Sequence, residues 1–152
     1  MLAALIPRLR VLLVTFWVGS LWTVGYVVAP LLFATLSDRA QAGTLAGLFF
    51  KAEAWISLIC GALLLAIIWT EREHPTRILQ IKLVICMLLC TLIGYFGLQP
   101  YMAELRAIAA QSGGIMDDAM RSRFGMLHGA ASAIYLIQSV LAVGLVLVLK
   151  SK

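Results

Sequence analysis

The chain has 152 residues, the length of a single domain, but its composition excludes an ordinary water-soluble protein. Hydrophobic residues make up 62% of it and charged residues only 12%, which is about half the usual charged share of a soluble domain. A soluble fold of this size could not bury so much apolar surface. The sequence therefore predicts an integral membrane protein.

The formal net charge of +5 raises the question of a nucleic-acid partner. The basic residues stand at the ends of apolar runs, where they would meet lipid headgroups, and they form no dense Lys/Arg cluster. We therefore expect the lipid bilayer, and no nucleic acid, as a partner. The three cysteines all lie within apolar runs, which does not suggest a disulfide framework.

Four apolar runs are long enough to cross a hydrocarbon core, which takes about 20 helical residues. They cover residues 11–29, 48–69, 78–98 and 124–149. We expect one membrane domain over residues 1–152, folded as an all-α antiparallel bundle of four transmembrane helices. The first run follows Arg8 and Arg10 like a signal peptide, but Pro30 comes directly after it at a poor cleavage position, so we interpret it as a retained span.

Residues near the ends of these runs predict where the helices begin, bend and stop. Residues 71–77 form a tight turn, which makes the second and third spans antiparallel neighbours. Asp38 with Gln41 resembles a capping box that starts the second helix early, and Asp117 is a plausible N-cap for the fourth. Pro100 should kink the third helix, which continues to about Ala110. Short helical extensions beyond the outer membrane face are therefore expected.

Small and polar residues on one face of a span indicate helix contact rather than lipid contact. The fourth span carries such a stripe, with His128 and Tyr135 at its edge: Gly125, Gly129, Ser132, Leu136 and Ser139. The first span has its own shared face: Gly19, Thr23, Tyr26 and Pro30. We expect Gly19 and Thr23 to pack closely against Gly125 and Gly129.

The two middle spans differ in how clearly they indicate a buried face. In the second span the inward face consists of Glu53, Ser57, Cys60 and Leu64, while Lys51 points the opposite way towards headgroups. In the third span two faces remain open, one with Lys82, Cys86, Cys90 and Gly97, the other with Thr91, Tyr95 and Gln99. The tryptophans are interpreted as lipid-facing or interfacial: Trp17, Trp22, Trp55 and Trp69.

The inward faces place several polar residues at a similar depth towards the outer leaflet. We predict a candidate polar site from Tyr26, Glu53, His128 and Ser132, with Arg123 as a possible partner of Glu53. Isolated polar groups in hydrocarbon are expensive, so His128 and Glu53 are expected in one hydrogen-bonded or water-bridged network. Glu53 is either a proton-carrying or ion-binding carboxylate, or an interfacial group paired with Arg123 or a backbone donor.

Short motifs over nearly the whole chain resemble a family of small four-helix membrane proteins of poorly defined function, the bacterial relatives of mammalian transmembrane protein 205. They are Trp17-Val-Gly19-Ser20, Val28-Ala29-Pro30-Leu-Leu-Phe33, Ala42-Gly43 before Phe49-Phe50, and Arg123-Phe124-Gly125-Met-Leu-His128-Gly129-Ala-Ala-Ser132. Where these relatives often have Asn shortly after the Ser, this chain has Tyr135. The resemblance therefore does not carry a hydrogen-bonding role to that position.

More distantly, the architecture resembles the copper-resistance D family and the haem-binding bacterial protoporphyrinogen oxidase, which raises the question of whether His128 binds copper or haem. The other histidine, His74, lies in the loop on the opposite side, so a bis-histidine haem would need a second chain. Cys86 and Cys90 stand one helical turn apart, a spacing that suits a soft metal but equally suits plain packing.

The sequence contains no nucleophile–base motif, phosphate loop or zinc-protease signature, so no catalytic residues are proposed and an enzyme is not expected. We expect a bacterial cytoplasmic-membrane protein without a cofactor that acts through helix–helix contacts. It would serve as an accessory or assembly subunit, or as a homo-oligomer that handles a small solute or ion. The alternative is a metal- or haem-handling membrane protein that uses His128.

The distribution of Lys and Arg predicts that both termini are cytoplasmic. The side with the termini and the second loop holds seven, namely Arg8, Arg10, Arg72, Arg77, Lys82, Lys150 and Lys152; the other holds five, namely Arg39, Lys51, Arg106, Arg121 and Arg123. Reporter fusions after Lys152 and within residues 111–116 should therefore report the cytoplasm and the outside, respectively. A C-terminal fusion that reports outside would reverse the orientation.

Overall fold

The computed structural model describes residues 2–70, 75–113 and 115–150. In chain order its elements are α1 (Leu2–Thr23), the π-helix η1 (Val24–Val28), α2 (Ala29–Thr35), α3 (Arg39–Thr70), α4 (Arg77–Thr91), the π-helix η2 (Leu92–Leu98), α5 (Gln99–Gln111) and α6 (Asp118–Lys150). The run α1–η1–α2 forms one long helix, and α4–η2–α5 forms another. Four long helices therefore make up the described part of the chain, and no strand occurs in it.

All four helices are long and apolar enough to cross a membrane, with mean hydropathies between 1.8 and 2.3. Each predicted apolar run lies within one of them, which confirms the all-α four-helix membrane bundle. The helices also continue beyond the runs, in α2, the start of α3, α5 and the start of α6. These continuations are the helical extensions that the capping residues and the long third helix predicted.

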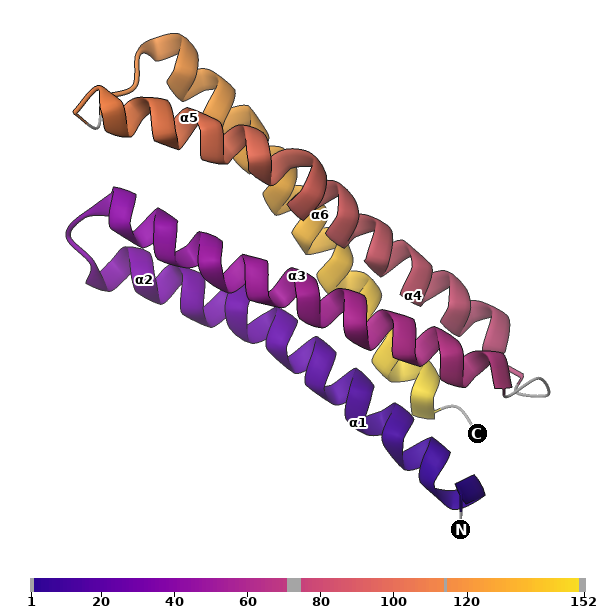
Figure 1. Cartoon of the computed structure of the whole chain (residues 1–152). Coiled ribbons are helices and arrows are strands. Elements are labelled where there is room, and N and C mark those ends of the chain that lie inside the picture. The colour runs from indigo at the N-terminus through magenta and orange to yellow at the C-terminus, as the bar shows by residue number, and fades with distance from the viewer. Residues whose placement is uncertain (1, 71–74, 114, 151–152) are drawn as a thin grey trace.

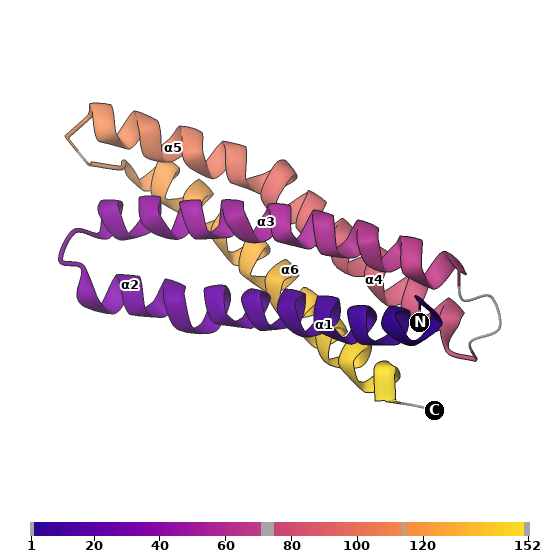
Figure 2. The same ribbon diagram turned by 60° about the horizontal axis from the view of Figure 1, so that its bottom comes forward.

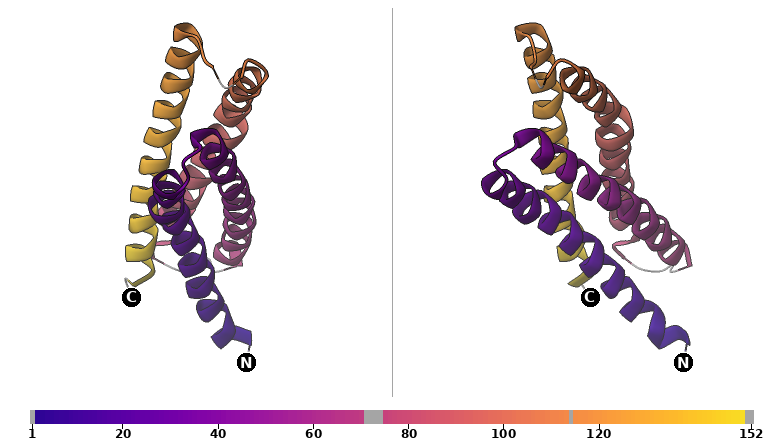
Figure 3. Two further views of the ribbon diagram at one scale, coloured as in Figure 1. Left: turned by 90° about the vertical axis from the view of Figure 1, so that its left-hand side faces the viewer. Right: turned by 60° about the vertical axis from the view of Figure 1, so that its left-hand side comes forward.

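The helices run antiparallel to their neighbours, and the start of α1 and the end of α6 lie at the same end of the bundle (Figures 1 and 2). The main contacts form a ring, in which α1 packs against α3, α3 against α4, α4 against α6, and α6 against α1. At the other end α2 pairs with α3, and α5 pairs with α6. There the two pairs separate from each other (Figures 1 and 3).

Each π-helical segment comes just before a proline, Pro30 after η1 and Pro100 after η2. A proline inside a helix has no N–H to donate and its ring clashes with the carbonyl four residues earlier. The wider π turn relieves this conflict, as shown by the Ala29 N–H, which donates to Val24 O five residues back. The helix therefore continues past each proline, and the predicted irregularity at Pro100 takes the form of a π segment.

The helix ends follow the predicted capping residues. Asp38 Oδ1 accepts hydrogen bonds from the backbone N–H groups of Ala40 (2.8 Å) and Gln41 (3.3 Å), and α3 begins immediately after it. Asp117 Oδ1 accepts from the Met120 N–H at 2.7 Å at the start of α6. The third long helix ends at Gln111, and Gly113 follows with φ of 71°, a left-handed conformation that favours glycine.

The apolar core lies where the four helices meet, around Val14, Trp17, Leu64, Met87 and Leu145. It confirms the predicted inward face of α3, since Glu53, Ser57, Cys60 and Leu64 are all buried. It also shows which of the two candidate faces of the third helix is buried: Thr91 lies inside, whereas Lys82 and Cys86 are exposed.

The predicted packing of the first helix on the small residues of the last is wrong within this chain. A Cβ atom added at Gly19, Gly125 or Gly129 would meet no atom within 4 Å, and Thr23 is exposed. The helix contacts instead involve other faces, because α6 turns Gln138, Ser139, Ala142 and Leu145 inward. Of the stripe on α6, the C-terminal member Ser139 is buried against the neighbouring helices.

The close approach of α3 and α4 occurs at Gly61, where an added Cβ atom would lie 2.5 Å from Leu88 Cδ2 and 2.9 Å from Leu88 Cγ. We expect Gly61→Ala to lower the free energy of unfolding by about 1–3 kcal/mol, because the extra methyl group overpacks this contact. Gly97→Ala, where the added Cβ atom would come no closer than 3.9 Å to another atom, serves as the control and should not destabilise. Equal melting midpoints for the two variants in detergent would contradict the contact.

Candidate functional site

A chain of hydrogen bonds joins the first and second long helices inside the bundle. Trp17 Nε1 donates to Ser57 Oγ at 2.7 Å, and Ser57 Oγ donates to Glu53 Oε1 at 3.3 Å. The three residues are 0%, 1% and 3% exposed. Trp17, which the sequence analysis assigned to the lipid or the interface, is thus wholly buried. The bulky indole fills the core while its N–H finds an acceptor on α3.

The second carboxyl oxygen of Glu53, Oε2, is buried and has no hydrogen-bond partner. The Ser20 hydroxyl lies beside the carboxyl group but donates to Trp17 O at 2.9 Å. The predicted inward orientation of Glu53 is confirmed. Its polar neighbours, however, are the hydroxyl groups of Ser20 and Ser57, and no ion pair of Glu53 occurs among the residues that the structure describes.

Tyr135 of α6 stands at the junction of three helices. Its hydroxyl donates to Leu21 O at 2.5 Å, and its ring makes edge contacts with Tyr26 (centroids 6.2 Å apart) and Phe50 (5.4 Å). A Cβ atom at Gly25 would collide with the tyrosine ring, so only glycine allows this approach. Tyr135 therefore has a hydrogen-bonding role that the family resemblance did not carry to this position.

Two further hydrogen bonds tie α6 to its neighbours. Tyr26 OH donates to Ser139 Oγ at 2.9 Å, and Gln138 Nε2 donates to Thr91 Oγ1 at 3.0 Å. Tyr26, although 50% exposed, thus uses its polar end inside the bundle. Nearer the separated end, Arg106 Nη1 of α5 donates to Gly43 O of α3 at 3.1 Å and connects the two helix pairs.

The predicted network between Glu53 and His128 is wrong. His128, Ser132 and Arg123 are all exposed on α6, and none of them is a hydrogen-bond or ion-pair partner of Glu53. The His128 ring stacks on Phe124, one turn earlier on the same helix, with centroids 6.1 Å apart. His128 lies two helical turns before Tyr135 on nearly the same face of α6. At that end of the bundle, however, the α5–α6 pair has separated from the α2–α3 pair, so His128 does not reach Glu53 (Figure 1).

The thiols do not form a compact ligand set. Cys60 is buried in the core, Cys86 is exposed and Cys90 is half-buried. Within the described ranges, no three His, Cys, Asp or Glu side chains come together in a way that could hold a metal ion.

Sequence reasoning missed Trp17, Ser20, Tyr135, Gln138 and Thr91 as members of a polar network. A signal existed for Trp17, because Val14, Trp17, Val18 and Leu21 recur at the three- and four-residue spacing of a buried helix face. For Tyr135 no local signal existed. Its role depends on Gly25, which lies more than a hundred residues away in the sequence.

Comparison with known proteins gives one family. A family model described as "Domain of unknown function (DUF4149)" matches residues 12–111. The match includes Trp17, Ser20, Glu53 and Ser57, and it ends before α6. No curated protein and no solved structure matches the chain.

We expect Ser57→Ala to destabilise the protein by about 1–3 kcal/mol, because the buried Trp17 N–H loses its acceptor. Ser122→Ala is the matched control, since Ser122 is exposed on α6, and it should change stability by no more than about 0.5 kcal/mol. Thermal melts of both variants in one detergent check this. An unchanged melting midpoint for Ser57→Ala would mean that the chain from Trp17 to Glu53 contributes nothing to the fold.

Proposed function

The chain belongs to the DUF4149 family of unknown function, and we propose that it is a non-enzymatic membrane protein that works through helix–helix contacts. In this proposal the outer half of α6 provides the contacting face. We define the α6 face as Gly125, His128, Gly129 and Ser132, all of which are exposed in the single chain.

The observation that carries the proposal is that small and polar residues of a membrane-spanning helix are exposed in the single chain. Added Cβ atoms at Gly125 and Gly129 would meet nothing within 4 Å. Small residues four apart let a second helix approach closely, and polar side chains between helices are favoured over polar side chains in lipid. The separation of the α2–α3 pair from the α5–α6 pair keeps this face free.

The partner proposed is a second copy of this chain. A face with Gly125 and Gly129 is complementary to itself, since the two glycines of each copy admit the backbone of the other. Dimers with twofold symmetry use such self-complementary surfaces. The dimer would be the working form in a role such as assembly of a larger membrane complex or handling of a small solute or ion.

The orientation of the chain, the membrane in which it lies and its wider kinship are also part of the proposal. The Lys/Arg distribution supports cytoplasmic termini and the bacterial cytoplasmic membrane. The motifs quoted above, the last of which spans Arg123 to Ser132, support kinship with the relatives of transmembrane protein 205.

Gly129→Leu should shift the purified protein from dimer to monomer while leaving the fold of each chain intact. The leucine side chain fills the space that the second helix would occupy, but it meets no atom within its own chain. Cross-linking and light scattering in mild detergent measure the oligomeric state, and a thermal melt measures the fold.

Gly97→Leu, another exposed glycine in a membrane-spanning helix but outside the α6 face, controls for the change of residue type. A monomeric parent protein would remove the proposed second copy. An absorption spectrum and a metal analysis of the same sample test the alternative, in which His128 binds haem or copper. A Soret band or stoichiometric copper would favour that alternative.

A further inference from the structure

We propose that Glu53 is a proton-binding carboxyl group that exchanges its proton with a lipid-facing groove through the Ser20 hydroxyl. The site lies between α1 and α3, away from the α6 face, so it is independent of the proposed dimer. It rests on the buried, unpartnered Oε2 atom and on the groove next to it.

The direction of the hydrogen bonds leaves one oxygen of Glu53 for a proton. The Trp17 indole can only donate, so Ser57 Oγ accepts from it and donates its own hydrogen bond to Glu53 Oε1. Oε1 is therefore an acceptor, whether the carboxyl group is charged or neutral. Oε2 accepts no hydrogen bond in the described part of the chain, and a buried carboxyl oxygen in that position favours binding a proton.

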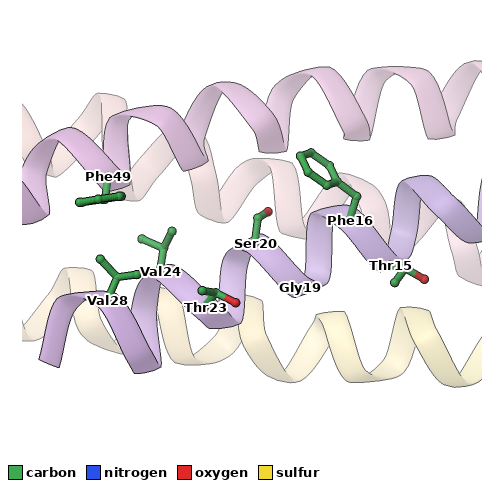
Figure 4. A pocket seen from close by; sticks show the side chains of 8 residues that line it. All are labelled: Thr15, Phe16, Gly19, Ser20, Thr23, Val24, Val28 and Phe49. Atoms are coloured by element: carbon green, nitrogen blue, oxygen red, sulfur yellow. The ribbon is translucent and has the colours of Figure 1, made fainter. Parts of the chain in front are cut away.

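The groove opens along α1 and is lined by Thr15, Phe16, Gly19, Ser20, Thr23, Val24, Val28 and Phe49. Figure 4 shows Ser20 between Phe16 and Val24, on the side of α1 that turns towards α3. Ser20 therefore connects the groove with the buried carboxyl group, because it lines the groove and also lies beside Glu53. It is half-buried, whereas Glu53 is only 3% exposed.

The Ser20 hydroxyl can serve either protonation state of Glu53. With Glu53 neutral, Ser20 donates to Trp17 O, as observed, and its lone pair can accept from the Oε2 hydroxyl. When Glu53 releases its proton, Ser20 can rotate away from Trp17 O and donate to the carboxylate. On release, the Ser20 oxygen takes the Oε2 proton as its own hydroxyl proton passes to a water molecule in the groove. This leaves a carboxylate on Glu53 and a hydronium ion in the groove, so atoms and charge balance.

A proton fits the surroundings better than a metal cation does. A hard cation such as Mg²⁺ needs about six oxygen ligands, and the side chains beside the Glu53 carboxyl group supply only the hydroxyls of Ser20 and Ser57. Cys60 on α3 and Tyr135 on α6 interact electrostatically with Glu53, and both side chains are neutral when protonated. The cations Lys51 and Lys82 are exposed, and Arg10 lies about two helical turns before Trp17 on α1.

Labelling with dicyclohexylcarbodiimide tests the site in the whole protein in detergent or lipid vesicles. This hydrophobic reagent adds the O–H of a carboxylic acid across one N=C bond, and the product rearranges to a stable N-acylurea with no leaving group. We expect one adduct, mapped to Glu53 by mass spectrometry. The labelling rate should fall about tenfold or more between pH 6 and pH 9 as the acid form is lost. Replacing choline chloride with sodium chloride should not change the labelling rate, because the proposed ligand is a proton and not a metal cation.

Matched variants locate the route. Glu53→Gln should abolish the adduct, whereas Glu104→Gln, at an exposed carboxylate on α5, should keep it. Gly19→Phe, which meets open space and fills the groove, should slow labelling severalfold; Leu63→Phe, a lipid-exposed change outside the groove, should not.

Several results would overturn the proposal. Labelling of Glu53 only after unfolding would show that the carboxyl group is closed off from the lipid. An equal rate at pH 6 and pH 9 would exclude proton exchange in this range, and protection by sodium would make a metal cation the ligand. A rate insensitive to Gly19→Phe would remove the groove as the route.

Discussion

The bundle depends on one constraint, which is that a polar group within the membrane must find its partner inside the protein because no water is available there. The bond from the Trp17 indole to Ser57 meets this constraint between α1 and α3. Tyr135 meets it between α6 and α1, and Gln138 between α6 and α4. The fourth contact of the ring, between α3 and α4, uses close apolar packing at Gly61 instead.

These bonds end where the helix pairs separate. Tyr135, Gln138 and Ser139 hold the middle of α6 against the other helices, whereas Gly125, His128 and Gly129 lie nearer the start of α6, beyond the last of these bonds, and are exposed. At that end of the bundle α5 and α6 form one pair and α2 and α3 another. The exposed α6 face is thus a consequence of this separation.

Glu53 departs from this constraint, because Oε2 is buried and accepts no hydrogen bond. A buried carboxyl oxygen without a partner next to a groove suggests chemistry rather than packing. Its position also matters for the family. Glu53, Ser57, Trp17 and Ser20 all fall within the matched residues 12–111, whereas the α6 face lies outside them.

The sequence by itself determined the features that depend on local composition and spacing. Apolar runs of membrane-spanning length specified four helices, Asp38 and Asp117 specified two of their starts, and the spacing of Glu53, Ser57 and Cys60 specified the inner face of α3. These properties need no knowledge of a neighbour, because helix formation and capping are decided within a few residues.

Only the tertiary structure decided where α6 stays in contact with the other helices and which residues make up the polar site. Sequence reasoning paired Glu53 with His128, since both lay at a similar depth on inward faces, but it could not show that the α5–α6 pair separates from the α2–α3 pair at that end of the bundle. Where α6 stays in contact follows from the fit between distant segments, above all from the Tyr135 ring lying against Gly25 and leaving no room for a Cβ atom. A contact of this kind has no local signature, so it becomes visible only when the helices are brought together.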